Sequence, residues 1–484
     1  MNESSRERLA APSNLELQDF DNSGENALNV TSFEDIPPDG GYAWVCTFCV
    51  FMINVHTWGV SSAWGVILNY FLSHSTFPNA SHLGFALIGG VSIGQCLLIV
   101  PLVTQTHQTV GTMPTLLLGT VLVSAALFSA SYATQFWHLL LTQGICFGSG
   151  MGFLYLTATA ILPKWFSSKR SFSSGLASSG TGLGGLAYSL IAGRSIETIG
   201  IQGTYRVLTA CALGANLLCS LLLRDRPSLH PAPSLLRPRR SHSRPAATTT
   251  TTTTPLFCSP TELTHLEVLL IIIWGTSTDL GFIALLYSLP NYATSISLTA
   301  SQGSIASACL NLGLAVGRPL MGYLSDRHGR INVSMVTTLV CAVLCLTLWV
   351  FLSSYPLLLL FALLAGSVCG TFWGTVAPVL TDVVGLNRLP ATFGLVCFML
   401  VAPTTVAEVI ALRLVDLAGG GYLGAKVYVG GLFAVGAVAL AVLRAWRFYE
   451  IERKGVLERN GGVGEFPGFG RWVAVEKLFL RGRV

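Results

Sequence analysis

Long apolar runs alternate with short polar connections along most of this chain. Twelve runs approach the roughly 20 residues that a helix needs to cross about 30 Å of hydrocarbon. The pattern therefore predicts an all-α membrane protein with twelve transmembrane helices. The runs lie near 42–68, 83–104, 112–131, 136–161, 171–193, 205–223, 265–288, 302–323, 331–351, 355–380, 391–414 and 424–446.

The composition supports a membrane protein, because 51% of the residues are hydrophobic and only 11% are charged. Soluble globular chains carry about 25% charged residues. The net charge of +5 comes from residues scattered between the apolar runs, so we expect no nucleic-acid partner. No metal-ligand spacing, cofactor motif or nucleophile–base triad stands out. We therefore expect neither an enzyme nor a cofactor or metal site.

Basic residues fall mainly in alternate connections. Three lie at 164–170, six arginines lie between 224 and 244, and Arg327 and Arg330 follow the eighth run. Since cytoplasmic loops carry the excess of Lys and Arg, both termini are predicted to be cytoplasmic. Asn79, in Asn79-Ala80-Ser81, then lies in the first outer loop as a glycan acceptor. We expect a multi-pass protein of the plasma membrane, with the vacuolar membrane as the alternative.

The pattern divides the chain into five parts. The polar residues 1–38 lack apolar periodicity. The central segment 224–264 is rich in Pro, Ser and Arg, with seven consecutive threonines at 248–254. Neither can build a packed core. The parts are a disordered cytoplasmic N-terminal tail (1–38), a six-helix bundle (39–223), a cytoplasmic low-complexity linker (224–264), a second six-helix bundle (265–446) and a cytoplasmic C-terminal tail (447–484).

The two bundles resemble each other in sequence. A shift of 218 residues aligns Pro101 with Pro319, and a shift of 222 aligns Gly148 with Gly370. Two parallel repeats of this kind are typical of secondary transporters. The first alignment places Gln108 opposite Asp326 and Thr112 opposite Arg330. The first bundle has therefore lost its copy of the charged turn.

The stretch 311–330 combines an arginine inside an apolar run with a charged turn. Burying a charge at membrane depth costs about 3 kcal/mol or more, and this cost must be offset. We therefore expect Arg318 to bind either an anionic substrate or a structural partner. We expect Asp326, Arg327 and Arg330 to bind a helix end across the bundle interface and hold one access state. Gly322 would let the neighbouring backbone approach.

Five more polar residues inside predicted helices are candidates for function. Asp279 and Glu408 are candidate proton carriers, because burial favours the protonated form of a carboxyl group. The alternatives are an internal ion pair for Asp279 and an exposed or Arg413-paired side chain for Glu408. His56 and Asn54 join Arg318 and Asn311 as candidate substrate-binding residues. A histidine here is otherwise a neutral packing residue, and an asparagine can simply join helices.

Three motifs resemble known transporter signatures. GRPLMGYLSDRHGR (317–330) is similar to the charged loop of the major facilitator superfamily. PKWFSSKRSFSSGLASSGTGLGG (163–185) and DGGYAWV (39–45), with Asp39, Gly40, Gly41 and Trp44, resemble the two signatures of monocarboxylate porters. The resemblance covers about 40–450 and is nearest to the fungal branch. It implies two pseudo-symmetric six-helix bundles that carry a small carboxylate with a proton.

Two positions depart from the pattern of animal lactate carriers. Where those carriers have a lysine in the first helix and an aspartate before the arginine, this chain has Ser62 and Leu314. We expect a monomeric secondary active transporter that moves a small organic anion by alternating access, with a proton as co-substrate. The alternatives are efflux of a fungal secondary metabolite, uptake of a vitamin-like compound and a non-transporting membrane sensor.

Overall fold

The computed structural model describes residues 39–73, 82–226, 265–352, 354–386 and 388–459. Within these ranges the ordered elements are all helices. The predicted tail 1–38, the acceptor Asn79, most of the linker and residues 460–484 lie outside the described residues.

The first half of the chain supplies helices α2 to α11. Short breaks divide several of the predicted crossings, for example at Thr57 and Ala63 in the first. The helices are α2 (Tyr42–His56), α3 (Trp58–Ser62), α4 (Trp64–Ser73), α5 (His82–Leu98), α6 (Val100–Val110), α7 (Thr112–Ala130), α8 (Phe136–Leu139), the π-helical segment η1 (Leu140–Cys146), α9 (Phe147–Thr159), α10 (Leu162–Trp165) and α11 (Arg170–Leu222).

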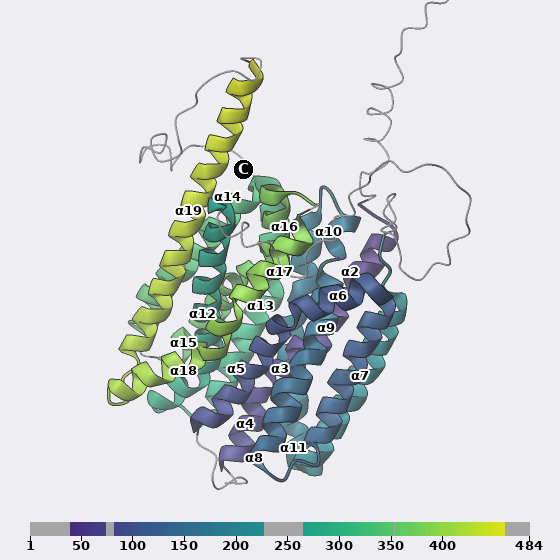
Figure 1. Ribbon diagram of the computed structural model, residues 1–484. Coiled ribbons are helices and arrows are strands. Elements are labelled where there is room, and N and C mark those ends of the chain that lie inside the picture. Colours follow the sequence, from purple (N-terminus) through teal and green to yellow (C-terminus); the bar gives the residue numbers. More distant parts are fainter. Residues whose placement is uncertain (1–38, 74–81, 227–264, 353, 387, 460–484) are drawn as a thin grey trace, which may run out of the picture. The chain divides into compact units, whose positions relative to one another are not determined.

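The second half supplies helices α12 to α19, which gather beside the first set (Figure 1). They are α12 (Leu266–Ser295), α13 (Ala300–His328), α14 (Arg330–Leu344), the π-helical segment η3 (Cys345–Trp349), α15 (Tyr355–Cys369), α16 (Thr371–Val384), α17 (Leu389–Met399), α18 (Val401–Leu417) and α19 (Leu423–Arg459). In Figure 1 the purple-to-blue and the green-to-yellow helices occupy different sides.

Helix α11 crosses twice, because its 53 residues reverse direction at Gly200. Gly200 has φ 72° and ψ 175°, a conformation that glycine adopts without steric cost. Both ends of α11 lie beside the start of α2: the Tyr42 hydroxyl donates to the Leu222 carbonyl, and Asp39 accepts from Ser167 and Ser168. The two crossings correspond to the predicted runs 171–193 and 205–223.

The described residues account for the predicted number of crossings. Ten helices or merged helices are long and apolar enough to span a membrane, and the pair α5–α6, bent by 44°, adds another. The second crossing of α11 completes the twelve. The structure thus confirms the predicted all-α membrane fold of two six-helix bundles.

Helix α19 continues past the predicted end of the last run at residue 446 and reaches Arg459. The apolar run ends there because arginines and glutamates begin, but these residues favour helix. Arg453 and Glu450 also form an ion pair of 3.7 Å along the helix surface. The predicted tail 447–484 therefore begins as helix.

Glycines allow the two halves to pack closely. A methyl group at Gly175 of α11 would lie 2.3 Å from the Arg318 carbonyl oxygen, and one at Gly322 of α13 would lie 2.4 Å from the Ser171 oxygen. On the other flank, a methyl group at Gly90 of α5 would lie 2.4 Å from the Thr405 carbonyl oxygen of α18. Any side chain at these positions would push the halves apart.

Candidate functional site

A cavity of about 630 Å³ lies between the two halves. Helices of both halves line it, and most of its wall is apolar or aromatic. Its polar and aromatic lining comes from Asn54, Trp58, Ser61, Ser62, Tyr155, Ser178, Thr181, Asp279, Phe282, Tyr287, Asn311, Arg318 and Trp373.

Arg318 of α13 enters this cavity with 5% of its surface exposed. Its Nη1 donates to the Ser178 carbonyl oxygen at 2.7 Å and to the Thr181 hydroxyl, both on α11 of the other half. Among the described residues its Nε has no hydrogen-bond partner. The guanidinium is thus fixed by one nitrogen, and the remaining donors are not all used.

Asp279 of α12 lies on the same cavity and is 2% exposed. Its Oδ1 accepts a hydrogen bond of 2.8 Å from Trp373 Nε1. Its Oδ2 has no partner within the described part of the chain, and no ion pair joins it there to Arg318. The alternative of an internal Arg318–Asp279 pair is therefore not what the structure shows.

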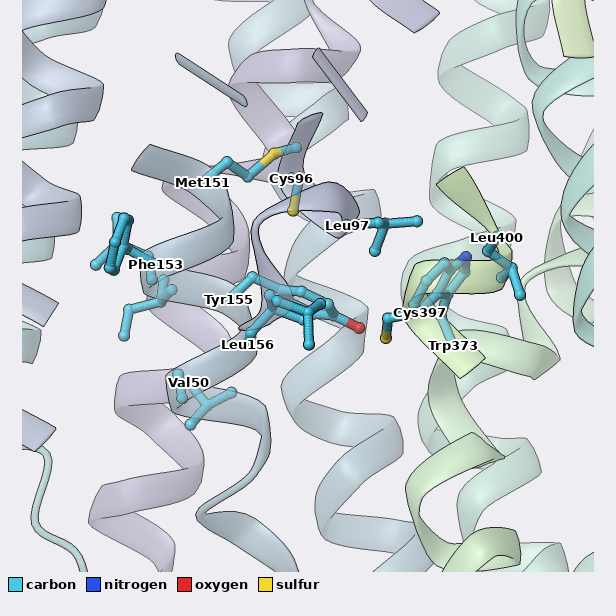
Figure 2. Close-up of a cluster of buried hydrophobic side chains, with 14 of the residues drawn as sticks. Val50, Cys96, Leu97, Met151, Phe153, Tyr155, Leu156, Trp373, Cys397 and Leu400 are labelled. Carbon is cyan, nitrogen blue, oxygen red and sulfur yellow. The ribbon is translucent and has the colours of Figure 1, made fainter. Parts of the chain in front are cut away.

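Three aromatic rings meet in the cavity, two from the first half and one from the second. Trp58 and Tyr155 have ring centroids 5.4 Å apart, and each lies 6.0 Å from Trp373. Figure 2 shows the Tyr155 hydroxyl directed toward Trp373 and Cys397 of the other half. Sequence reasoning missed Tyr155 and Trp373, since an aromatic residue in an apolar run carries no signal of its own.

The structure brings two more predicted residues to the cavity. Asn54 donates from Nδ2 to the carbonyl oxygens of Val50 and Ala177, at 3.0 and 3.1 Å. Asn311 donates to the Ser307 oxygen at 3.1 Å. Both side chains line the cavity wall, although their measured bonds join helices rather than a substrate.

His56 does not line the cavity. Its Nδ1 pairs with the Tyr188 hydroxyl of α11, and the two rings are perpendicular at 5.6 Å. Two positions along a helix turn a side chain by about 200°, so His56 points away from Asn54. The predicted substrate role of His56 is not supported by this position, and the packing alternative describes what is observed.

Glu408 of α18 is also absent from the cavity lining. It lies within electrostatic reach of the cavity residue Tyr287. Arg413 is exposed, and within the described ranges no salt bridge joins it to Glu408. Glu408 therefore stands behind the cavity wall rather than in it.

The charged residues of the turn 322–330 lie at one end of the bundles. We call this end, which contains Asp39, Lys164, Arg170, Asp326 and Arg330, the charged end. Asp326 accepts from the backbone N–H groups of Ser171 and Phe172, at 3.1 and 2.8 Å. These groups open α11, so the contact joins the second half to a helix start of the first. A carboxylate is favourable there because the first N–H groups of a helix lack internal partners.

Arg330 and Arg327 differ in what they bind. Arg330 pairs with Asp326 at 3.5 Å and with Asp382 of α16, which sequence reasoning missed. Arg327 instead lies 4.6 Å over the Tyr323 ring of its own helix. Residues four apart share one helix surface, so this contact keeps Arg327 on its own helix, and its binding across the interface stays a prediction.

The residues of the first signature secure the turn before α11. Asp39 accepts hydrogen bonds from the hydroxyl and backbone N–H groups of Ser167 and Ser168. Burial alone would raise the pKa of Asp39, but these bonds outweigh it and lower the pKa to about 2. Gly41 has φ 60°, next to Gly40, and Trp44 packs on Phe166 with centroids 5.1 Å apart.

In the first half, Asp225 forms the ion pairs at the charged end, although it is not the residue aligned with Asp326. Asp225, just after α11, pairs with Lys164 at 3.0 Å and lies 3.7 Å from His107 Nε2 of α6. The first half lacks the aligned acidic residue, as the sequence predicts, but Asp225 supplies a carboxylate beside the turn from α6 to α7. Because Asp225 belongs to another repeat position, the alignment could not reveal it.

Among the described residues no group of His, Cys, Asp or Glu is arranged to hold a metal ion.

The fold and the cavity define a membrane transporter of small molecules, with two sets of helices around one site. The family model of the major facilitator superfamily matches residues 43–278 and 269–479. The chain belongs to this superfamily, which confirms the resemblance of its charged loop.

Relatives agree with this assignment. The probable transporter MCH2 of Saccharomyces cerevisiae is 30% identical over 434 residues, covering 87% of this chain and 88% of that protein. Monocarboxylate transporter 12 of Rattus norvegicus is 26% identical over 408 residues, covering 79% and 82%. In fold alone, the chain is similar to the crystal structure of the human organic anion transporter MFSD10 (TETRAN), with a TM-score of 0.59 at 16% identity, covering 84% of this chain and 100% of that one.

Proposed function

We propose that this protein is a secondary active transporter that moves a small organic anion, a monocarboxylate or a related metabolite, by alternating access. The proposal rests on the environment of Arg318. It is a buried guanidinium in a cavity between the two halves, and part of its donor set is unused. A cation in this position is best balanced by an anionic ligand, because a carboxylate accepts charge-assisted hydrogen bonds.

Asp279 is the proposed proton carrier. It lies in the same cavity with one unpartnered oxygen, so a proton can bind there without displacing the bond from Trp373. Glu408 is the second candidate, through its proximity to Tyr287. A carboxyl group that is exposed in turn to the two sides of the membrane can take up a proton on one side and release it on the other.

The charged end is proposed to be cytoplasmic, with both termini on that side. The basic residues of the connections support this orientation. The contacts of Asp326 and Arg330, together with the close approach at Gly322, would then hold the cytoplasmic side closed. We place the monomeric protein in the plasma membrane, with a glycan at Asn79 as part of the same proposal.

Transport of a larger metabolite is the second candidate. Ser62 and Leu314, at the two positions where animal lactate carriers have a lysine and an aspartate, both line the cavity. The cavity also presents the rings of Trp58, Tyr155 and Trp373. These features suit a flat, ring-bearing substrate, such as a secondary metabolite or a vitamin-like compound, better than lactate.

Substitution of Arg318 tests the anion site. Arg318→Lys keeps the charge but loses the planar fork, so the apparent affinity for a carboxylate should fall roughly ten- to a hundred-fold. Arg318→Ala should be worse, and uptake of a neutral compound should change little. The measurement is uptake of a radiolabelled carboxylate panel in a carrier-deficient host, corrected for surface abundance.

The exposed Arg413, outside the cavity, provides the matched control. Arg413→Ala should leave affinity unchanged. Unaltered affinity for an organic anion in a well-expressed Arg318→Ala protein would contradict the proposal.

A further inference from the structure

Gly370 separates α15 from α16 and lies directly against the Arg318 guanidinium. A Cβ atom at Gly370 would be 2.8 Å from Arg318 Nε and 2.9 Å from Nη2. Both distances are shorter than real Cβ contacts. The backbone itself does not demand glycine, since φ is −87° and ψ is 12°. What requires glycine at this position is the space that the guanidinium and Leu314 Cδ2, which would lie 2.5 Å from such a Cβ atom, occupy.

The guanidinium has two differently used edges. A guanidinium carries five N–H donors in a rigid fork. Nη1 is committed to Ser178 and Thr181 of α11, while Nε is unpartnered among the described residues. The edge formed by Nε and Nη2 is the one that lies against Gly370. A side chain at Gly370 would therefore displace the edge that is still free to bind an anion, and with it the bonds of Nη1.

The equivalent glycine of the first half has a different role. Gly148 aligns with Gly370, and a methyl group there would meet the Ser92 carbonyl oxygen at 2.4 Å. Its closest neighbour is the backbone of another helix, so Gly148 serves helix packing. The nearest neighbours of Gly370 are instead side-chain ends, at Leu314 Cδ2 (2.5 Å) and Arg318. These ends can move, so alanine at this position should fold but should shift the guanidinium.

We propose that Gly370 is a positioning residue for the anion site: its bare backbone holds the guanidinium of Arg318 in the orientation that binds a substrate carboxylate. The inference rests on the proposed function and extends it to a residue that never touches the substrate. It also assigns the carboxylate to the Nε–Nη2 side of Arg318, because Nη1 is already saturated by α11.

The test compares Gly370→Ala with Gly374→Ala, one helical turn further along α16. A methyl group at Gly374 would meet only Arg318 Cγ, at an ordinary 3.9 Å. The probes are benzoate, whose flat ring suits the aromatic cavity, and benzamide, its neutral counterpart. Binding is read from the thermal stabilisation of the purified full-length protein, since a ligand that binds the native state raises the melting temperature.

We expect benzoate, and not benzamide, to stabilise the wild-type protein and Gly374→Ala. Gly370→Ala should fold with a normal melting temperature but bind benzoate at least roughly tenfold more weakly, in line with lost charge-assisted bonds. The double variant Leu314→Ala/Gly370→Ala relieves the contact with Leu314 alone, so it should stay defective. Recovery of benzoate binding in the double variant would assign the effect to Leu314 and overturn the proposal.

Two further outcomes separate this inference from the proposed function. Equal benzoate affinity in Gly370→Ala and Gly374→Ala, with binding still lost in Arg318→Ala, would reject the role of Gly370 and leave the anion site intact. Absence of any stabilisation of the wild-type protein by benzoate would overturn the inference. Undiminished binding in Arg318→Ala would reject the anion site itself.

Discussion

At the scale of single residues, the cavity holds a cation and a carboxylate that do not neutralise each other. Arg318 is bound to α11 of the other half, and Asp279 is bound to Trp373 of its own half. Each keeps an unpartnered polar atom among the described residues. Buried polar atoms normally have partners, so two such atoms in one cavity suggest that substrate and proton complete the site.

Asp279→Asn tests the proton carrier. Asparagine still accepts the bond from Trp373 but cannot release a proton. In proteoliposomes, accumulation of the transported anion driven by a pH gradient should fall to the level of protein-free vesicles, while exchange of labelled for unlabelled anion should persist. The exposed Asp416 gives the control, since Asp416→Asn should keep gradient-driven uptake. Retention of that uptake in Asp279→Asn would transfer the role to Glu408.

At the scale of elements, the start of α11 at the charged end is bound by two carboxylates. Asp39 holds the turn at Ser167 and Ser168, and Asp326 accepts from the next N–H groups, at Ser171 and Phe172. One carboxylate belongs to the same half as α11 and the other to the opposite half. Asp39 thus fixes in place the helix end that Asp326 binds.

Asp39→Asn should lower the stability of the protein by about 1 kcal/mol at neutral pH, since charge-assisted hydrogen bonds are lost from a partly exposed site. The folded pKa of about 2 is below the usual value of 3.8, so the stabilisation is complete above about pH 4. It disappears as the pH falls toward 2.

The melting temperatures of wild type and Asp39→Asn in detergent should therefore differ by a constant amount from pH 7 to about pH 4 and converge as the pH falls from about 4 toward 2. Glu197→Gln serves as control, because Glu197 and its partner Arg194 are exposed. A difference in melting temperature that stays constant from about pH 4 toward pH 2 would contradict the assigned role of the carboxylate.

At the scale of the whole molecule, the two halves are joined at the charged end through Asp326 and on both flanks through glycine contacts. Alternating access requires at least some of these contacts to break. Contacts of a few kcal/mol are enough to decide which state is populated, since about 5.5 kcal/mol takes a two-state ratio from 1:99 to 99:1.

Asp326→Asn should shift the protein toward the state that opens at the charged end. A single cysteine placed at Ser178, on the cavity wall, should then react faster with a membrane-impermeant thiol reagent applied from that side. Arg327→Ala is the matched control, because Arg327 contacts Tyr323 within its own helix. Identical labelling rates in wild type and Asp326→Asn would show that this contact does not control access.

The sequence by itself determined the membrane fold. The bilayer sets the length of the apolar runs and the placement of the basic connections. These patterns, and the repeat of the two halves, can be read without knowing any tertiary contact. It also identified Arg318 and Asp279, because a charge within an apolar run is conspicuous wherever it lies. What it could not determine was which side of a helix meets the cavity when the helix is apolar all around.

Tertiary structure alone decided the rest. It turned His56 toward Tyr188, left Glu408 behind the cavity wall, and gave Arg330 a second carboxylate at Asp382. It also brought Tyr155, Trp373 and Gly370 to Arg318 and Asp279, although they come from different helices. The physical reason is that such contacts depend on the rotation and spacing of helices far apart in sequence, which short-range patterns do not encode.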